Sequence, residues 1–281
     1  MKGLDYKKNH YVPVSYLKRW IKYIYWGQKV KYIFSQRLNE KVIRKVDINN
    51  QCQKSNFYTL PIEFKSADRK SIEKAFFGYS DEIYSKAMSH SFDIGKDPST
   101  SDINGLLFFS LYQSFRTPKF KDSTILKIQE LKTTNPEFQK MTEDFAYNLS
   151  YLLTKVFPLL YDDCLVEILV SFPGTWFLTT DNPSTYWIDE WNNLTYLPTI
   201  VGTDFKVSNL KLLIPLNPQV CFLIHLNMIQ GEKNYKEKTY VPPFIKRTVK
   251  LNEVDLINKS LIEAADKVLY SMDEETLLKY T

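Results

Sequence analysis

The chain has 281 residues, of which 44% are hydrophobic and 15% aromatic, and this composition supplies a substantial core and excludes a largely disordered protein. Residues 1–50 hold twelve of the 37 Lys and Arg but only three of the 32 Asp and Glu, so the net charge of +5 comes from this segment while the remaining residues sum to −4. No stretch approaches the roughly 20 apolar residues of a membrane span or resembles a signal peptide, so we expect a cytoplasmic protein without a membrane partner.

Helical spacing of Tyr16, Trp20 and Tyr23 predicts a short helix over residues 15–24. Two stretches with the residue pattern of strands, Lys29–Ser35 and Lys41–Asp47, follow and are joined around Leu38-Asn39-Glu40. They predict a basic hairpin. The N-terminal segment, residues 1–60, is therefore expected to be a basic, aromatic element.

The middle of the chain, residues 66–157, predicts a helical block. One helix is expected over Ser66–Ser89, followed by a polar loop over Ser91–Thr100. A second, very apolar helix starts at a Ser101 or Asp102 cap and stops before Pro118. Further helices are expected over Ser123–Leu131 and Pro136–Phe157.

Residues 163–281 predict a sheet followed by a helix. Leu165–Phe172 and Thr175–Thr180 flank Pro173-Gly174 and read as a hairpin, as do Lys211–Leu216 and Gln219–Leu226 around Asn217-Pro218. Asn227–Lys238 is expected to be a loop. The last helix is predicted to start at an Asn252 cap with Asp255 as its capping-box residue, and its apolar face continues through Val268 and Leu269. Together these elements predict an α+β fold made of a basic N-terminal hairpin, a central helical block, an antiparallel sheet and a C-terminal helix.

Cysteine and histidine spacing predicts neither a disulfide framework nor a metal centre. Cys52, Cys164 and Cys221 form no CxxC pair, and no two of the three histidines share an HxH or HExxH motif. We therefore expect no metal and no cofactor.

Cations and aromatic rings alternate in the first 50 residues, as they do in grooves that bind single-stranded nucleic acid. Lys18, Arg19 and Trp20 are the candidate substrate-binding residues of this segment. The competing interpretation is that Tyr16 and Trp20 pack inward while the lysines face solvent, and the helical spacing favours it.

Three motifs place polar side chains beside a proline: Asn9-His10-Tyr11-Val12-Pro13, Ser114-Phe115-Arg116-Thr117-Pro118 and Thr179-Thr180-Asp181-Asn182-Pro183. Their convergence would assemble one polar site, with the histidine as acid or base and the arginine as a bidentate phosphate clamp. Each also has a structural interpretation, namely a satisfied histidine, a buried ion pair joining Arg116 to Asp181, and an Asx-Pro turn. The candidate catalytic residues are His10, Arg116 and Asp181, and the candidate substrate-binding residues beside them are Tyr11, Gln113, Thr117 and Asn182.

The ordered motifs resemble those of an uncharacterised bacterial family, domain of unknown function 4238. The resemblance includes NHYVP, Asn56-Phe57-Tyr58-Thr59, QSFRTP, TDNP, Pro215-Leu216-Asn217-Pro218 and a last helix with Asn258, Ala265 and Tyr270. It spans nearly the whole chain and implies a single domain, 1–281. Val14-Ser15 and Thr180 depart from the usual residues without removing a candidate site group. The family supplies no activity to carry over.

The leading functional hypothesis is a metal-independent phosphodiesterase or ribonuclease-like hydrolase that binds RNA or single-stranded nucleic acid, with bacterial toxin action or antiviral defence as its setting. The second is a non-catalytic sensor or adaptor that binds a nucleotide or an acidic partner protein through Arg116. A third is that the motifs only define caps and turns. The sequence does not indicate an oligomeric state.

Overall fold

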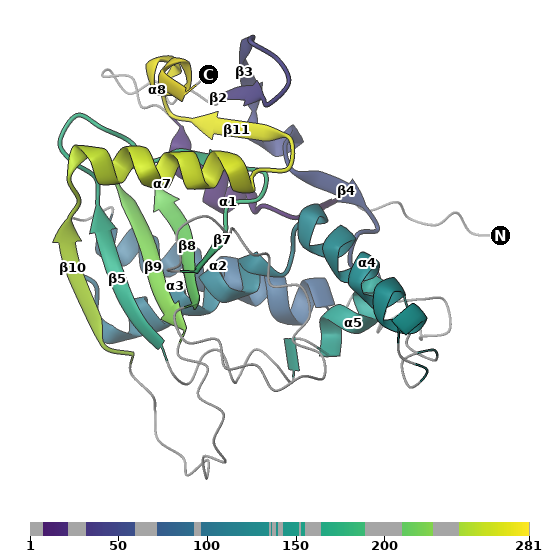
Figure 1. Cartoon of the computed structure of the whole chain (residues 1–281). Helices are drawn as coiled ribbons and strands as arrows, with labels where there is room; N and C mark the ends of the chain where they lie inside the picture. Colours follow the sequence, from purple (N-terminus) through teal and green to yellow (C-terminus); the bar gives the residue numbers. More distant parts are fainter. Residues whose placement is uncertain are drawn as a thin grey trace.

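The computed structural model describes residues 8–21, 32–59, 72–92, 97–134, 136, 139, 143–151, 153–154, 164–188, 210–226 and 242–280. Within these ranges the fold is α+β, as predicted, and combines a central sheet with helices on both faces (Figure 1). The predicted loop over 227–238 lies outside the described residues, as do 93–96 of the loop predicted over 91–100.

The N-terminal region begins with β1 (Lys8–His10), α1 (Val14–Leu17) and the 3₁₀ turn η1 (Lys18–Trp20). The predicted basic hairpin is confirmed as β2 (Tyr32–Arg37) paired antiparallel with β3 (Ile43–Asp47). A second 3₁₀ turn, η2 (Ile48–Asn50), leads to β4 (Gln53–Ser55), which pairs antiparallel with β1.

The helical block starts with one continuous helical stretch made of the π-helical η3 (Ile72–Gly78), α2 (Tyr79–Ala87) and the π-helical η4 (Met88–Phe92). It is followed by α3 (Thr100–Ser114), whose N-terminus is capped by Ser99 in a capping box with Asp102. The predicted helix at 123–131 begins earlier, as α4 (Pro118–Thr134), because proline is well suited to the first helical position. The helix predicted over 136–157 is wrong in its start, since α5 (Phe145–Tyr151) follows an Asp144 side chain that accepts a hydrogen bond from Tyr147 N–H.

The described residues contain a five-stranded sheet in the order β10-β5-β9-β8-β7. Its strands are β5 (Cys164–Val170), β7 (Thr185–Ile188), β8 (Leu210–Asn217), β9 (Val220–Leu226) and β10 (Phe244–Thr248). The predicted β8–β9 hairpin is confirmed, whereas β10 runs parallel to β5 in a sheet that is otherwise antiparallel.

A four-stranded sheet joins the two ends of the chain in the order β3-β2-β11-β6. The hairpin predicted around Pro173-Gly174 is wrong, because β6 (Thr179–Thr180) pairs with β11 (Val268–Ser271) and not with β5. The turn itself is present, with Gly174 at a φ of +80°, but Phe177 N–H then donates to Pro218 C=O and Leu178 N–H to the Asn258 side chain. Those hydrogen bonds give the N–H groups of the segment predicted as a strand over 175–180 partners outside β5, so the segment does not pair with β5.

The C-terminal helix is α7 (Leu251–Ala264), and α8 (Glu274–Tyr280) follows β11. The predicted Asn252 cap is wrong, since Lys250 occupies the N-cap position and its N–H donates to Glu253 at 2.8 Å. The predicted extension through Val268 and Leu269 is also wrong, because these residues form β11 against β2.

The core lies on both faces of the five-stranded sheet, with α2 and α3 on one side and α7 on the other (Figure 1). Alternate residues of β5 face opposite sides, so Val166 and Ile168 join the cluster of α3, whereas Leu169 joins that of α7. This alternation explains why both helices are needed, since each buries one apolar face of the same strands.

Candidate functional site

Arg116 follows the end of α3 and is the most constrained of the predicted site residues. Its guanidinium is 3% exposed and donates to both carboxylate oxygens of Asp81 on α2, at 2.6 and 3.3 Å. It also donates to the backbone C=O of His10 at 2.9 Å and lies 4.5 Å from the centroid of the Phe77 ring. The expected pairing of Arg116 with Asp181 is therefore wrong, because Asp81 occupies the fork.

His10 ends β1, and its imidazole is partly exposed. The Nε2 atom lies 3.1 Å from the backbone C=O of Asn49, the acceptor that fixes the ring. Burial raises the pKa of the Asp81 carboxyl, and the charges of Arg116 and His10 act against this effect. The structure thus holds the backbone C=O of His10 and the carboxylate of Asp81 on the same guanidinium, that of Arg116.

Asp181 follows β6 and is 2% exposed. Its carboxylate accepts hydrogen bonds from the N–H groups of Asp266 at 3.0 Å and Lys267 at 2.9 Å, in the connection from α7 to β11. Asn182 donates from its side chain to Ala264 C=O at 2.9 Å. Burial raises the pKa of Asp181 to about 6. The TDNP motif therefore fastens the end of α7 and lies apart from the Arg116 fork.

Tyr11 links the NHYVP motif to both other motifs. Its backbone C=O accepts a hydrogen bond from the Gln113 side chain at 2.8 Å. Burial raises the pKa of the Tyr11 hydroxyl, and electrostatic interactions with Cys52 and Asp181 raise it further. Thr117 accepts from Phe120 N–H at 3.3 Å and so caps the start of α4. The three motifs do meet, but through backbone carbonyls and caps as well as side chains.

Of the three residues expected to line a nucleic-acid groove, Trp20 is buried, whereas Lys18 and Arg19 are cations at the surface. Trp20 is fully buried, lies 4.7 Å from the Tyr16 ring and donates to Phe177 C=O at 3.4 Å, so the predicted inward packing is confirmed. Its ring is therefore not accessible for stacking on a base. Lys18 is exposed, and Arg19 contacts the Ser89 hydroxyl at 3.4 Å.

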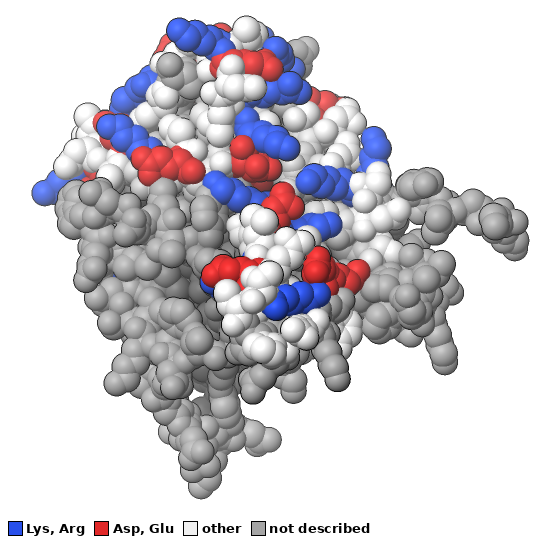
Figure 2. Space-filling model, turned by 45° about the vertical axis from the view of Figure 1, so that its right-hand side comes forward, with Lys and Arg blue, Asp and Glu red and all other residues white. Residues whose placement is uncertain are grey.

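Basic side chains surround the NHYVP motif at the surface. Lys54 and Lys121 lie 5.7 and 5.2 Å from the centroid of the Phe57 ring, in cation–π geometry. On the face shown in Figure 2, Lys and Arg are interspersed with Asp and Glu. In the β2–β3 hairpin, for example, Arg37 and Arg44 both pair with Glu40. On this face the described cations are thus mixed with acidic side chains and do not form a broad basic patch.

Sequence reasoning missed Asp81, which the helical period could have revealed. Asp81 stands four residues after Phe77 and three before Tyr84, and both aromatic residues are fully buried, so all three share one helical face. Two further polar residues belong to the same cluster: Asn9 donates to Glu73 and accepts from Phe57 N–H at 2.9 Å. A charged residue on the buried face of a helix requires a partner, and that requirement was the available signal.

The other two histidines contact carboxylates in separate networks. His90 Nδ1 lies 2.9 Å from Asp102, the capping-box residue of α3. His225 lies 2.6 Å from Glu167, which also accepts from Arg247 at 3.0 Å and so ties β9, β5 and β10 together. Among the described residues, no group of three His, Cys, Asp or Glu side chains is placed to hold a metal ion. Within the same ranges no helix combines the length and apolar character required to cross a bilayer.

The fold and the motif junction define an α+β protein in which three separated motifs brace one another. The chain belongs to the family described as Protein of unknown function (DUF4238), whose model matches residues 8–275. No curated protein and no solved structure matches the chain.

Proposed function

We propose that the protein is a phosphodiesterase that cleaves RNA or single-stranded nucleic acid, with His10 as its acid–base group. The observation that supports this proposal is that the Arg116 side chain, at the end of α3, binds both the backbone C=O of His10 on β1 and the carboxylate of Asp81 on α2. Histidine is the side chain best suited to transfer protons near neutral pH.

Arg116 has a positioning role in this proposal instead of the phosphate clamp expected from the sequence. Its fork is filled by Asp81, and a substrate phosphate would have to displace that carboxylate from a guanidinium that is 3% exposed. Arg116 therefore holds the backbone of His10 and the carboxylate of Asp81. The Asp81 side chain is 27% exposed, so the cluster is open to solvent on the Asp81 side.

Phosphate contacts are assigned to the lysines around the motif. Lys54 and Lys121 both lie over Phe57, and Lys8 precedes His10 by two residues on the same strand. Because residues two apart in a strand share a face, Lys8 and His10 point to the same side of the β1–β4 ribbon. A chain of phosphates that crosses this ribbon would gain affinity from cations at both ends. Toxin action or antiviral defence is the biological setting that we propose.

The decisive experiment compares two histidine variants in a cleavage assay. Purified protein is incubated with fluorescently labelled RNA and single-stranded DNA, with and without EDTA. His10→Ala is expected to keep the parent melting temperature and to lose roughly 100-fold or more of the cleavage rate, the lower range for an acid–base group. His90→Ala, which also removes a partly exposed imidazole bonded to one neighbour, is the matched control and is expected to cleave like the parent.

Cleavage by His10→Ala at the parent rate would exclude this assignment, and loss of cleavage in EDTA would show that the reaction depends on a metal. A parent protein that binds nucleic acid without cleaving it would support the second candidate, a non-catalytic adaptor. One observation favours that candidate: the side chains of Arg116 and Asp181 both form hydrogen bonds with other groups of the fold. The dependence of binding affinity on salt concentration would then identify the phosphate contacts. The loss of each contact lowers the slope of log affinity against log salt concentration.

A further inference from the structure

The imidazole of His10 is held by a segment that is distant in the sequence, residues 47–53. This segment runs from the end of β3 through η2 to β4. It brings the backbone C=O of Asn49 to within 3.1 Å of His10 Nε2, and β4 pairs with β1 so that Gln53 lies opposite His10. The Arg116 side chain binds the His10 backbone C=O at 2.9 Å. Both the backbone and the ring of His10 are therefore held in place.

The hydrogen bond to Asn49 decides which ring nitrogen of His10 carries the proton. A backbone C=O can only accept, so Nε2 is the donor of this bond. A neutral imidazole has a single N–H, and its other nitrogen bears a lone pair. In neutral His10 that nitrogen is Nδ1, and within the described part of the chain no group forms a hydrogen bond with it. Nδ1 is thus the atom of the neutral ring that can take up a proton.

Asp47 fixes the position of Asn49 from one end of the segment. As the N-cap residue of η2, it accepts hydrogen bonds at Oδ1 from the backbone N–H and from the side-chain amide of Asn49, both at 2.9 Å. Asp47 is exposed, so its charge is screened by solvent and its contribution is the placement of this acceptor oxygen. Removal of the oxygen would loosen Asn49 and, with it, the acceptor of His10 Nε2.

Cys52 anchors the other end of the segment. Its φ of +50° lies in the left-handed region, which residues other than glycine adopt only where their surroundings hold them. The buried thiol lies 3.4 Å from the Tyr270 hydroxyl on β11, and the Cys52 C=O accepts from Tyr11 N–H at 2.9 Å. Asn49 therefore lies between two fixed points, Asp47 and Cys52.

We propose, resting on the function proposed above, that Nδ1 of His10 accepts the proton in the cleavage reaction and that Asp47 is a positioning residue for this ring. The O–H bond of the attacking hydroxyl or water breaks, its proton goes to the Nδ1 lone pair, and its electron pair forms the new bond to phosphorus. The P–O bond to the leaving oxygen breaks with its electron pair, and that oxygen takes a proton from water. The Nε2–H group stays on the Asn49 C=O throughout.

Nitrogen NMR of the full chain, with the heavy nitrogen isotope in its histidines, tests the tautomer without any substrate. His10→Ala identifies the His10 signals by their loss. At a pH at which the rings are neutral, His10 is expected to show a protonated Nε2 and an unprotonated Nδ1. His90 is the internal reference for the opposite tautomer, because its Nδ1 atom lies 2.9 Å from the Asp102 carboxylate. A protonated Nδ1 in neutral His10 would overturn the inference, whether or not the protein cleaves nucleic acid.

Two variants of Asp47 test its positioning role by NMR and by cleavage kinetics. Asp47→Ala removes the acceptor of the Asn49 N–H, so neutral His10 is expected to become a mixture of both tautomers, and kcat is expected to fall roughly 10- to 100-fold with KM nearly unchanged. Asp47→Asn keeps an acceptor oxygen and is expected to retain the parent spectrum and most of the parent kcat. An unchanged tautomer in Asp47→Ala, or an Asp47→Asn variant that behaves like Asp47→Ala, would exclude this role.

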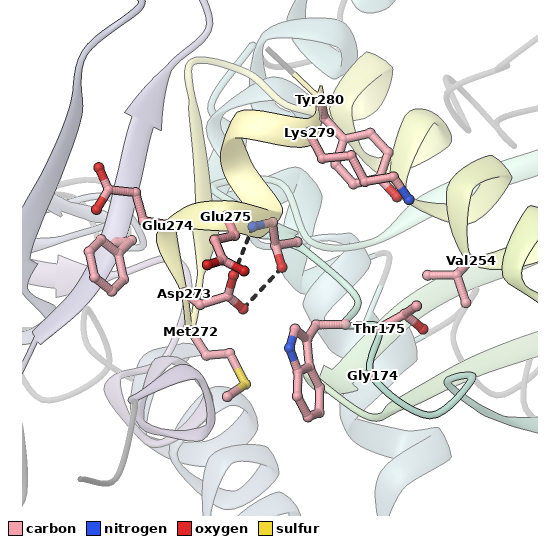
Figure 3. A pocket seen from close by; sticks show the side chains of 12 residues that line it. Gly174, Thr175, Val254, Met272, Asp273, Glu274, Glu275, Lys279 and Tyr280 are labelled. Carbon is pink, nitrogen blue, oxygen red and sulfur yellow. Dashed lines mark hydrogen bonds between the residues drawn. The ribbon is translucent and has the colours of Figure 1, made fainter.

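Asp273→Ala is the matched control. The Asp273 carboxylate also caps a helix, since it accepts from Thr276 N–H at 2.7 Å and from the Thr276 hydroxyl at 3.0 Å at the start of α8, the two bonds drawn as dashed lines in Figure 3. This variant is expected to lose stability but to keep the His10 tautomer and kcat. Equal changes of the His10 signals in both alanine variants would refute the positioning role. A parent protein with the expected tautomer and no cleavage would refute the proposed function, and with it the catalytic role of Nδ1, while the tautomer assignment would stand.

Discussion

Replacing Asp81 by Asn tests whether Arg116 depends on the carboxylate that fills its fork. The change keeps the shape of the side chain but removes the charge that faces a guanidinium buried to 3% exposure. Breaking a buried pair from one side costs about 3 to 5 kcal/mol, because the remaining charge is left without compensation. We expect the lower end, about 3 kcal/mol, since the Asp81 side chain is 27% exposed and the amide oxygen still accepts one N–H.

Urea unfolding followed by tryptophan fluorescence measures this loss, with Glu82→Gln as the control. Glu82 is the next residue of α2, and its pair with Lys86 is fully exposed and screened by solvent, so its removal should leave the midpoint nearly unchanged. A double variant with Arg116→Met should lose about 2 kcal/mol less than the sum of the two single variants. An Asp81→Asn midpoint equal to that of the control, or full additivity in the cycle, would refute the reasoning.

Two further predictions concern other parts of the fold. The folded-state pKa of Asp181 is about 6, raised above the ordinary 3.8, so the folded state binds more protons and the free energy of unfolding should fall by about 2 kcal/mol as pH rises from 4 to 6.5. Asp181→Asn should not show this decrease in the free energy of unfolding. Urea melts at both pH values in which parent and variant lose the same free energy of unfolding would contradict the prediction. Gly105→Ala should destabilise by about 1 to 2 kcal/mol, because the added Cβ overlaps the stiff, β-branched side chain of Ile83 where α3 meets α2. Ser101→Ala, on the exposed side of α3, should leave the melting temperature nearly unchanged when both variants are compared by thermal melts. Equal melting temperatures of the two variants would exclude close packing at Gly105.

Local patterns predicted the elements whose hydrogen bonds are local. The β2–β3 and β8–β9 hairpins and the helix α3 follow from short-range periodicity and turn residues, because their partners lie within a few positions. The errors occur where a distant partner decides the structure. The segment after Gly174 carries a hairpin signal, yet its N–H groups donate to Pro218 and Asn258, which no local rule connects to it.

The candidate site divides in the same way. The motifs singled out His10, Arg116 and Asp181, and the structure joins the Arg116 side chain to the backbone of His10. Their partners were not predictable from the motifs alone, because Asp81 comes from another helix and the acceptor for Arg116 is a backbone carbonyl. A backbone group carries no residue-type signal, so sequence reasoning cannot identify which carbonyl a buried arginine will bind.

The position of β11 has a consequence for the order in which the protein can assemble. Leu269 pairs with Gln36, so the N-terminal hairpin receives its neighbouring strand from a residue more than 200 positions later in the chain. Closing so long a loop is slow, and during synthesis this partner emerges only after nearly all of the other elements. Until then the inner edge of β2 has unpaired backbone groups, which are a template for pairing with another chain. Nascent chains that stop before residue 268 therefore expose this edge, and a newly made molecule is vulnerable to aggregation there until β11 has been made.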